Sequence, residues 1–230
     1  MKQCFVYAVW FCVALPFLCS CSNDDSNEFG NNRSIQLSTV EIQSTNNSPY
    51  FVLDDGMKLW VTESLVPYSA LKAGSRVMIN FTYLRYGNDG FNYFIRLNGF
   101  SVVPLQDVIN LTPENQDSIG NVPVDIQKMW IGASYLNLNF FINLPTPKQP
   151  IINLAVNRIE PPVDDGYAHL QLCYNNNGST GSLVSGFVSF ALGEYASGDS
   201  SYKGLKVLVN LANKGDTIYT FPYPAASVEN

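Results

Sequence analysis

The chain has 230 residues, of which 46% are hydrophobic and 14% are charged, so it has enough apolar material for a packed core. This composition argues against disorder beyond the N-terminal tail. The formal net charge of −6 argues against DNA or RNA as a partner, because phosphate binding needs clustered lysine and arginine.

Residues 1–20 predict a leader that is removed during export. Its apolar run, from Cys4 to Leu18, is shorter than the roughly 20 residues that a transmembrane helix needs. We predict that the leader is cleaved on the N-terminal side of Cys21 and that Cys21 is modified with diacylglycerol. An ordinary secretory leader with a coincidental cysteine is the alternative. The predicted signal-peptidase box consists of Leu18, Cys19 and Ser20.

Residues 21–32 predict a flexible acidic tether, because they are polar and have no apolar periodicity. Two or three acyl chains on one cysteine would hold the protein at a membrane, since each buried methylene contributes about 0.8 kcal/mol. Acidic residues directly after the lipidated cysteine resemble the signal that sends lipoproteins of gut Gram-negative anaerobes to the cell surface. We therefore predict a surface-exposed outer-membrane lipoprotein. A plain solvated linker is the other interpretation.

Residues 33–104 predict a small barrel. Apolar residues alternate with polar ones in several segments, and Asp54-Asp55-Gly56 is typical of a hairpin turn. Five strands in about 70 residues, without a long helix, favour a barrel of the OB type. The expected strands cover residues 34–42, 50–53, 57–61, 76–84 and 91–97.

In an OB-type barrel, the outward face of strands two and three is the usual ligand platform. We predict that Lys58, Trp60, Phe94 and Arg96 lie on this face. An exposed aromatic ring beside a cation is suited to stacking on a sugar or a peptide. The alternative is that Trp60 and Phe94 pack against the second domain.

Residues 105–120 predict a connecting segment with one helical turn, capped by Thr112 with Pro113 at the first helical position. Residues 121–230 then predict an antiparallel β-sandwich of about seven strands with an immunoglobulin-like arrangement. The fold class is therefore all-β. The expected sandwich strands cover residues 124–131, 134–144, 151–159, 167–174, 183–192, 205–211 and 217–223.

Several motifs between residues 50 and 225 resemble those of the NigD-like lipoprotein family, in the same order. This resemblance implies an N-terminal OB-like domain and a C-terminal β-sandwich. The family is named for its association with a bacteriocin operon, which implies an immunity or accessory role. It has no established catalytic residues to carry over, and the proline-rich loop at 144–150 departs from its pattern. The matching motifs are Leu53-Asp54-Asp55-Gly56 with Leu59-Trp60, Val66-Pro67-Tyr68, Gly74-Ser75-Arg76-Val77, Leu111-Thr112-Pro113-Glu114-Asn115 with Asp117-Ser118-Ile119-Gly120, and Met129-Trp130-Ile131-Gly132.

Two tripeptides, Asp117-Ser118-Ile119 and Asp216-Thr217-Ile218, resemble the short motif that some of these bacteria O-glycosylate after export. Ser118 and Thr217 are therefore candidate glycosylation sites. A motif of three residues is expected to occur by chance in a chain of this length, and the intact mass of the native mature protein tests the prediction.

The sequence contains no catalytic motif. His169 and Cys173 share a predicted strand face, but four residue rises of about 3.3 Å place them roughly 13 Å apart, too far for a catalytic pair. Asp54-Asp55 and Asp164-Asp165 each precede a glycine, so we interpret them as solvated turn acids. Weak calcium binding is the minority interpretation. We expect no cofactor and no metal.

We therefore predict a lipid-anchored, non-enzymatic interaction or ligand-binding module. Its partners would be the membrane, through the lipid, and a surface glycan, a peptide or a protein, with no role for nucleic acid. One alternative is a bacteriocin-associated immunity or accessory protein. The alternative from another class is a surface hydrolase that cleaves glycans or peptides with paired carboxylates.

Overall fold

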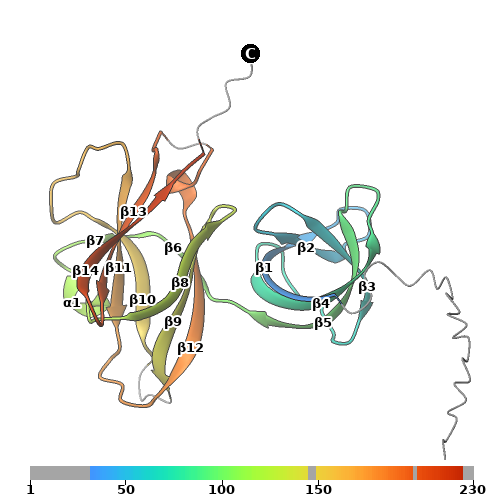
Figure 1. Cartoon of the computed structure of the whole chain (residues 1–230), viewed down its shortest axis with the longest axis horizontal. Helices are drawn as coiled ribbons and strands as arrows, with labels where there is room; N and C mark the ends of the chain where they lie inside the picture. Colours follow the sequence, from blue (N-terminus) through green and yellow to red (C-terminus); the bar gives the residue numbers. More distant parts are fainter. Residues whose placement is uncertain (1–31, 145–148, 199–200, 225–230) are drawn as a thin grey trace, which may run out of the picture.

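The computed structural model describes residues 32–144, 149–198 and 201–224, nearly all of them in strands and the loops between them. A small barrel and a larger sandwich lie side by side (Figure 1). Cys21, Leu18, Cys19 and Ser20 lie outside the described residues, so their predicted roles stay predictions. Within the described part of the chain, every helix is too short or too polar to span a bilayer.

The barrel confirms the prediction for the first domain. Its strands close in the order β1-β2-β3-β5-β4, and their alternating apolar residues fill the interior. Gly56 lies in the turn between β2 and β3 and has a φ of 86°. Glycine adopts this conformation readily because it has no Cβ atom. The strands are β1 (Arg33–Ile42), β2 (Pro49–Leu53), β3 (Lys58–Ser64), β4 (Arg76–Tyr86) and β5 (Tyr93–Val102).

The second domain is a sandwich of two sheets, with strand orders β14-β13-β11-β10-β7 and β6-β12-β9-β8. All seven strands that the sequence predicted are present, and their inward residues form one core between the sheets. These strands are β8 (Asp125–Gly132), β9 (Tyr135–Leu144), β10 (Ile151–Asn157), β11 (Ala168–Asn175), β12 (Ser182–Ala191), β13 (Gly204–Leu211) and β14 (Gly215–Pro222).

The segment predicted as a connector contributes to both sheets of the sandwich. β6 (Leu105–Asp107) pairs in parallel with β12, and β7 (Ile109–Leu111) pairs in parallel with β10. β11 and β13 are also parallel, so the expectation of an entirely antiparallel sandwich is wrong for these three pairs. Alternation of apolar residues shows which face of a strand is buried, but it does not encode the direction of the neighbouring strand.

The predicted helical turn exists but starts later than expected. α1 (Gln116–Ile119) has Asn115, rather than Thr112, at its N-cap position. The side-chain oxygen of Asn115 accepts a hydrogen bond from the backbone N–H of Thr112 at 2.9 Å, which closes a turn before the helix. Pro113 therefore belongs to that turn.

α1 covers one end of the outer face of the five-stranded sheet. Ile119 and Leu111 pack there against Ala155 of β10 and Cys173 of β11, in a small core separate from the one between the sheets. The other end of the same face carries His169 and the residues around it, which this cover does not reach. One half of the outer face is thus closed and the other half is open.

Candidate functional site

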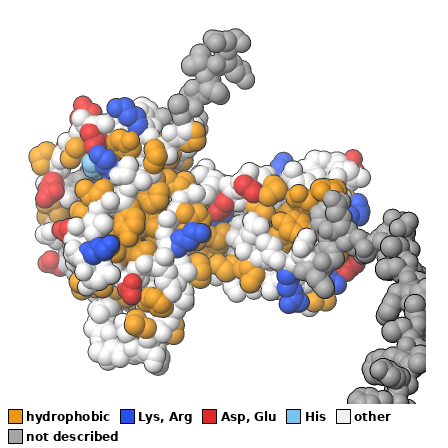
Figure 2. Space-filling view, in the orientation of Figure 1, with side chains coloured by type: hydrophobic (Ala, Val, Ile, Leu, Met, Phe, Trp, Pro, Cys, Tyr) orange, Lys and Arg blue, Asp and Glu red, His pale blue; other side chains and the backbone are white. Residues whose placement is uncertain are grey.

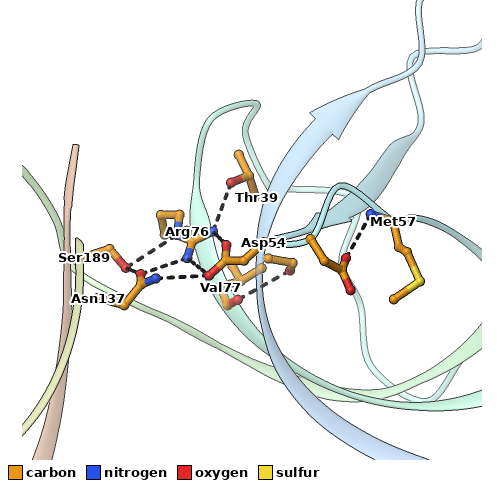
Figure 3. A network of polar contacts seen from close by, with 9 residues as sticks. Thr39, Asp54, Met57, Arg76, Val77, Asn137 and Ser189 are labelled. Atoms are coloured by element: carbon orange, nitrogen blue, oxygen red, sulfur yellow. Dashed lines mark hydrogen bonds and ion pairs between the residues drawn. The ribbon is translucent and has the colours of Figure 1, made fainter. Parts of the chain in front are cut away.

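The interface between the two domains is built on Arg76, whose side chain is fully buried (Figure 3). Its Nη1 donates to Oδ1 of Asp54 at 2.7 Å, and its Nη2 donates to Oδ2 of the same carboxylate at 3.1 Å. Nη2 also donates to Oδ1 of Asn137 in β9 at 3.0 Å, and Nε donates to Oγ of Ser189 in β12 at 3.4 Å. The guanidinium therefore pairs with Asp54 within the barrel and joins the barrel to the sandwich through two hydrogen bonds.

The partners of Arg76 also bind one another. Nδ2 of Asn137 donates to Oδ2 of Asp54 at 3.0 Å, and Oγ of Ser189 donates to Oδ1 of Asn137 at 2.7 Å. A Cβ atom built on Gly132 would lie 2.2 Å from Oδ2 of Asp54, so only glycine fits at this point of β8. We call Asp54, Arg76, Asn137 and Ser189 the interdomain joint. Its polar groups are paired with one another, and we assign it a structural role.

The interdomain joint corrects the interpretation of the first aspartate pair. Asp54 is an ion-pair partner rather than a solvated turn acid, because the turn between β2 and β3 faces the sandwich. Asp55, next to it, is exposed as predicted, and its carboxylate accepts a hydrogen bond from the backbone N–H of Met57 at 3.0 Å.

A cleft of about 490 Å³ lies over the open half of the outer sheet face. We call this hollow the sandwich cleft. Figure 2 shows basic, acidic and hydrophobic side chains gathered on the upper part of the sandwich. The floor of the cleft comes from β11, β13 and β14, one wall is the loop 158–163, and another contains η1 (Gly193–Tyr195). The residues whose side chains we assign to it are Asn157, Arg158, Glu160, Val163, His169, Gln171, Glu194, Tyr195, Tyr202, Lys206, Leu208 and Ile218.

Strand register sets the chemistry of the cleft floor. His169 of β11 lies opposite Lys206 of β13, which makes a polar row. Gln171 lies opposite Leu208, and Leu208 lies opposite Ile218 of β14, which is 58% exposed. The floor therefore changes from charged to apolar over two residues along the strands.

Asp165 holds the polar row in place from the end of the loop that precedes β11. Its Oδ2 accepts a hydrogen bond from Nζ of Lys206 at 2.5 Å, and its Oδ1 lies 2.9 Å from Nε2 of His169. The ammonium of Lys206, followed by the imidazole of His169, holds the pKa of the Asp165 carboxyl well below its usual range. The ammonium also lies 4.8 Å from the centre of the Tyr167 ring.

Asp165 therefore corrects the interpretation of the second aspartate pair. The turn is present, with Gly166 at a φ of 81°, and Asp164 is exposed as predicted. Asp165 is instead an ion-pair partner, because the turn folds back over the sheet. Among the residues that the structure describes, no three His, Cys, Asp or Glu side chains are grouped to hold a metal ion.

Two tyrosines form the aromatic part of the cleft wall. The ring centres of Tyr195 and Tyr202 are 6.1 Å apart, with an angle of 33° between the ring planes. The hydroxyl of Tyr223 donates a hydrogen bond to the backbone oxygen of Tyr195, which fixes this wall to the end of β14. Burial raises the pKa of Tyr195, and Glu194 raises it further, whereas the charge of Arg158 lowers it.

The predicted barrel platform lies on adjacent strands. Trp60 of β3 is opposite Phe94 of β5 in the register. The Trp60 ring packs on Phe91 at 5.0 Å, and the guanidinium of Arg85 covers Phe94 at 3.8 Å. These contacts stay within the barrel, unlike the predicted alternative of packing against the second domain. The platform stays a prediction.

Lys58 and Arg96, the two cations of that platform, differ in their surroundings. Lys58 is exposed, whereas Arg96 is half-buried and its Nε donates to Oδ1 of Asn98 at 3.4 Å. Phe94 is buried, with 8% of its surface exposed, so Trp60 and Lys58 are the more accessible part of the barrel platform.

The candidate glycosylation sites differ in accessibility. Ser118 is exposed on α1, and its hydroxyl donates to the backbone oxygen of Asn115 at 2.8 Å. Thr217 is half-buried in β14, and its hydroxyl donates to the backbone oxygen of Gly215 at 3.2 Å. Both sites stay predictions, with Ser118 the more accessible.

Cys173 lies apart from His169, as expected from their spacing on one strand. It is buried under α1, and burial raises the pKa of its thiol to about 11. His169 bonds to Asp165 instead. Sequence reasoning missed the combination of Asp165, His169 and Lys206, since Lys206 is 41 residues from Asp165 and no local pattern marks the pair.

Comparison with solved structures gives relatives across most of the chain. A protein of unknown function from Bacteroides vulgatus is 50% identical, with a TM-score of 0.81, and the match covers 85% of this chain and 92% of that one. A "NigD-like immunity protein" from Bacteroides caccae is 16% identical, with a TM-score of 0.59 and coverage of 84% and 97%. A "putative lipoprotein" from Bacteroides fragilis is 10% identical, with a TM-score of 0.60 and coverage of 84% and 99%. The last two show the fold alone.

Comparison with curated proteins gives no match. Two family models match the chain in order. The model of the NigD-like N-terminal OB domain matches residues 37–99, which lie in the barrel. The model of the NigD-like C-terminal β-sandwich domain matches residues 107–223, half of the whole chain, and includes β7 and α1 from the segment between the domains. This protein belongs to the NigD-like family.

Proposed function

We propose that this protein is a lipid-anchored, non-catalytic module of the cell envelope that binds a ligand in the sandwich cleft. The observation that carries the proposal is the cleft itself, where an apolar floor meets two tyrosines and a fixed row of polar groups. Its volume of about 490 Å³ is in the range of small-molecule sites. Such sites combine apolar walls with a few placed polar groups, as this one does.

Binding fits the polar groups of the cleft better than catalysis. Lys206 and His169 are both tied to Asp165, at 2.5 Å and 2.9 Å. A lysine becomes a nucleophile when its charge is removed, and an adjacent carboxylate stabilises that charge. The ion pair therefore favours a lysine that donates hydrogen bonds over one that attacks a substrate.

The lipid anchor places the two domains at a membrane surface. Support comes from Cys21 and the residues before it, together with the tether up to residue 32. The test is metabolic labelling with palmitate in the producing bacterium. Label should enter the protein and disappear in Cys21→Ser, whereas Cys19→Ser, two residues earlier, should keep it. The anchor is contradicted if Cys21→Ser keeps the label, or if the parent protein takes up no label.

The binding site is tested with the chain expressed from Ser22 onward and applied to arrays of glycans and of peptides. Tyr202→Ala removes a ring of the cleft wall, and Trp60→Ala removes the central ring of the barrel platform. We expect the first variant to lose binding and the second to keep it. The reverse result would place the site on the barrel. A bacteriocin of the producing strain, used as a further probe, tests the immunity role.

One observation favours a second candidate function. Glu160 and Glu194 both line the cleft, beside Tyr195. Glycoside hydrolases use two carboxyl groups about 5–10 Å apart. A hydrolase would release products from a glycan bound in the cleft, and Glu160→Gln or Glu194→Gln would stop the release without preventing binding. Binding without product release supports the non-catalytic module.

A further inference from the structure

The floor of the sandwich cleft presents two kinds of surface side by side. Leu208 and Ile218 form an apolar patch, while Gln171 and His169 bring polar groups to the same face. On the other half of this face, α1 covers the corresponding positions of β10 and β11. The open half therefore leaves the outer face of the sheet exposed. Its mixture of apolar and polar side chains suits an amphipathic ligand.

The charged groups around the cleft carry both signs, and the ion pair at its polar row is already formed within the protein. Asp165 binds Lys206 and His169, so an anionic ligand would have to compete with a carboxylate that is in place. Arg158 donates from Nε to the neutral amide oxygen of Asn110 at 2.9 Å, and its positive charge is balanced by the carboxylate of Glu160 in the same lining. Glu194 adds a negative charge to the wall, and the chain as a whole carries −6. A ligand with a net negative charge would gain little here, so a neutral molecule fits better.

The polar groups that face the cleft suit hydroxyl groups. An ammonium has three donors, of which Asp165 accepts from one of Lys206, so donors remain for a ligand. The amide of Gln171 both donates and accepts. A sugar hydroxyl also donates and accepts, and several hydroxyls lie along one edge of a pyranose ring. His169 and Gln171 lie two residues apart on β11, and Lys206 lies opposite His169, so all three can face such an edge from one side.

The aromatic wall suits the other side of a sugar. Tyr202 is 37% exposed and lies 6.1 Å from Tyr195 between ring centres. The face of an aromatic ring carries negative charge from its π electrons, and the C–H groups of a pyranose face carry partial positive charge. Stacking on Tyr202 would also remove apolar surface from water.

We infer that the ligand of the sandwich cleft is a short neutral saccharide. Tyr202 and Tyr195 stack on one of its faces, and Lys206, His169 and Gln171 bind its hydroxyls. This inference rests on the proposed function, since it names the ligand class of the same cleft.

The test is a titration of the chain from Ser22 onward, followed by ¹H–¹⁵N correlation spectra. The neutral probes are maltotriose, xylotriose, mannotriose and triacetylchitotriose. The comparison probes are trigalacturonic acid and a pool of uncharged tripeptides. At least one neutral saccharide should shift the amide signals of His169, Gln171 and Lys206, while the signals of Lys58 and Trp60 stay in place.

Variants assign the saccharide to the aromatic wall. Tyr202→Ala should weaken the binding constant by tenfold or more, and Tyr202→Phe, which keeps the ring, should stay within about twofold of the parent. Trp60→Ala, on the barrel, serves as the control that should not change binding. The side chain of Tyr202 is partly exposed, so Tyr202→Ala should fold, which its unchanged thermal midpoint would show.

The outcomes separate the inference from the proposed function. Shifts in the cleft caused only by trigalacturonic acid or the tripeptides overturn the neutral saccharide and leave the cleft as a binding site. Shifts on the barrel alone overturn the cleft as the site. No shift with any of the probes overturns the saccharide inference, and failure of the glycan and peptide arrays as well overturns the proposed function.

Discussion

The interdomain joint and the sandwich cleft each contain an aspartate from a turn with the sequence Asp-Asp-Gly. In the joint it is the first aspartate, Asp54, and in the cleft it is the second, Asp165. Asp54 meets a fully buried arginine and is itself 17% exposed. Asp165 meets Lys206 and His169, and all three side chains are between 27% and 32% exposed.

This difference in solvent exposure separates a structural from a binding role. Burial of a charge is costly unless every donor and acceptor is paired, and the joint meets this condition with Asn137 and Ser189. The cleft leaves donors of Lys206 open to solvent, where a ligand can use them. The same local motif thus takes on either role, depending on what the tertiary structure places beside it.

The largest expected effect comes from removing the cation of the interdomain joint. Arg76→Met leaves the carboxylate of Asp54 without its partner, and breaking a buried pair in this way costs about 3–5 kcal/mol. The free energy of unfolding in urea measures the loss. Arg85→Met removes an arginine that stacks on Phe94 at the barrel surface and is the matched control. Equal losses in the two variants would contradict the role of the joint.

A smaller loss is expected from crowding the joint without removing a charge. Gly132→Ala places a methyl group against the Asp54 carboxylate, and overpacking of this kind costs about 1–3 kcal/mol. Gly99→Ala in β5 is the control, because a Cβ there meets nothing within 4 Å. Urea unfolding should separate the two variants. If both are equally stable, the joint tolerates displacement of Asp54.

The cleft aspartate should matter less for stability and should show a dependence on pH. Because Lys206 and His169 lower the pKa of Asp165 in the folded state, its contribution is present above the unfolded pKa and is lost as the pH falls towards the folded value. The urea midpoint of the parent should exceed that of Asp165→Asn at neutral pH. The difference between the two urea midpoints should narrow as the pH falls below about 4. A gap that does not change with pH would exclude the ion pair as its cause.

The smallest effect, almost no reaction with a thiol reagent, is expected on the closed half of the outer sheet face. Cys173 is the one cysteine after Ser22, and burial raises the pKa of its thiol to about 11. A thiol reagent at neutral pH should therefore leave the folded chain unlabelled and label the chain fully in urea. Rapid labelling without urea would show that α1 opens, so that the two halves of the face differ less than the structure indicates.

Local patterns explain why the elements of the fold were predictable. The alternation in Val77, Ile79 and Phe81 identifies a barrel strand, and the same residues are fully buried in the structure. Asp-Asp-Gly identifies both turns because glycine tolerates a positive φ. The parallel pairing of β6 with β12 and of β7 with β10 was not predictable, since three-residue strands carry no pattern of their own.

The candidate site was predictable only in part. The barrel platform with Lys58 and Trp60 was predicted because an alternating strand shows which side chains point outward, and it stays a prediction. Tyr202 and Lys206 escaped notice, because nothing in the sequence says that the loop after β10 folds over β13. The two aspartate pairs were noticed, and each was interpreted from its own turn without the partner that the fold supplies.

The strands, the turns and the order of barrel and sandwich follow from local sequence alone, because neighbouring residues encode these features through periodicity and backbone preference. Which charged side chains meet depends instead on the folded arrangement of the two domains. Arg76 reaches Ser189 across 113 residues, and Lys206 reaches Asp165 across 41. Such pairs depend on strand register and on how one domain packs against another, and residues close in the chain carry no record of either.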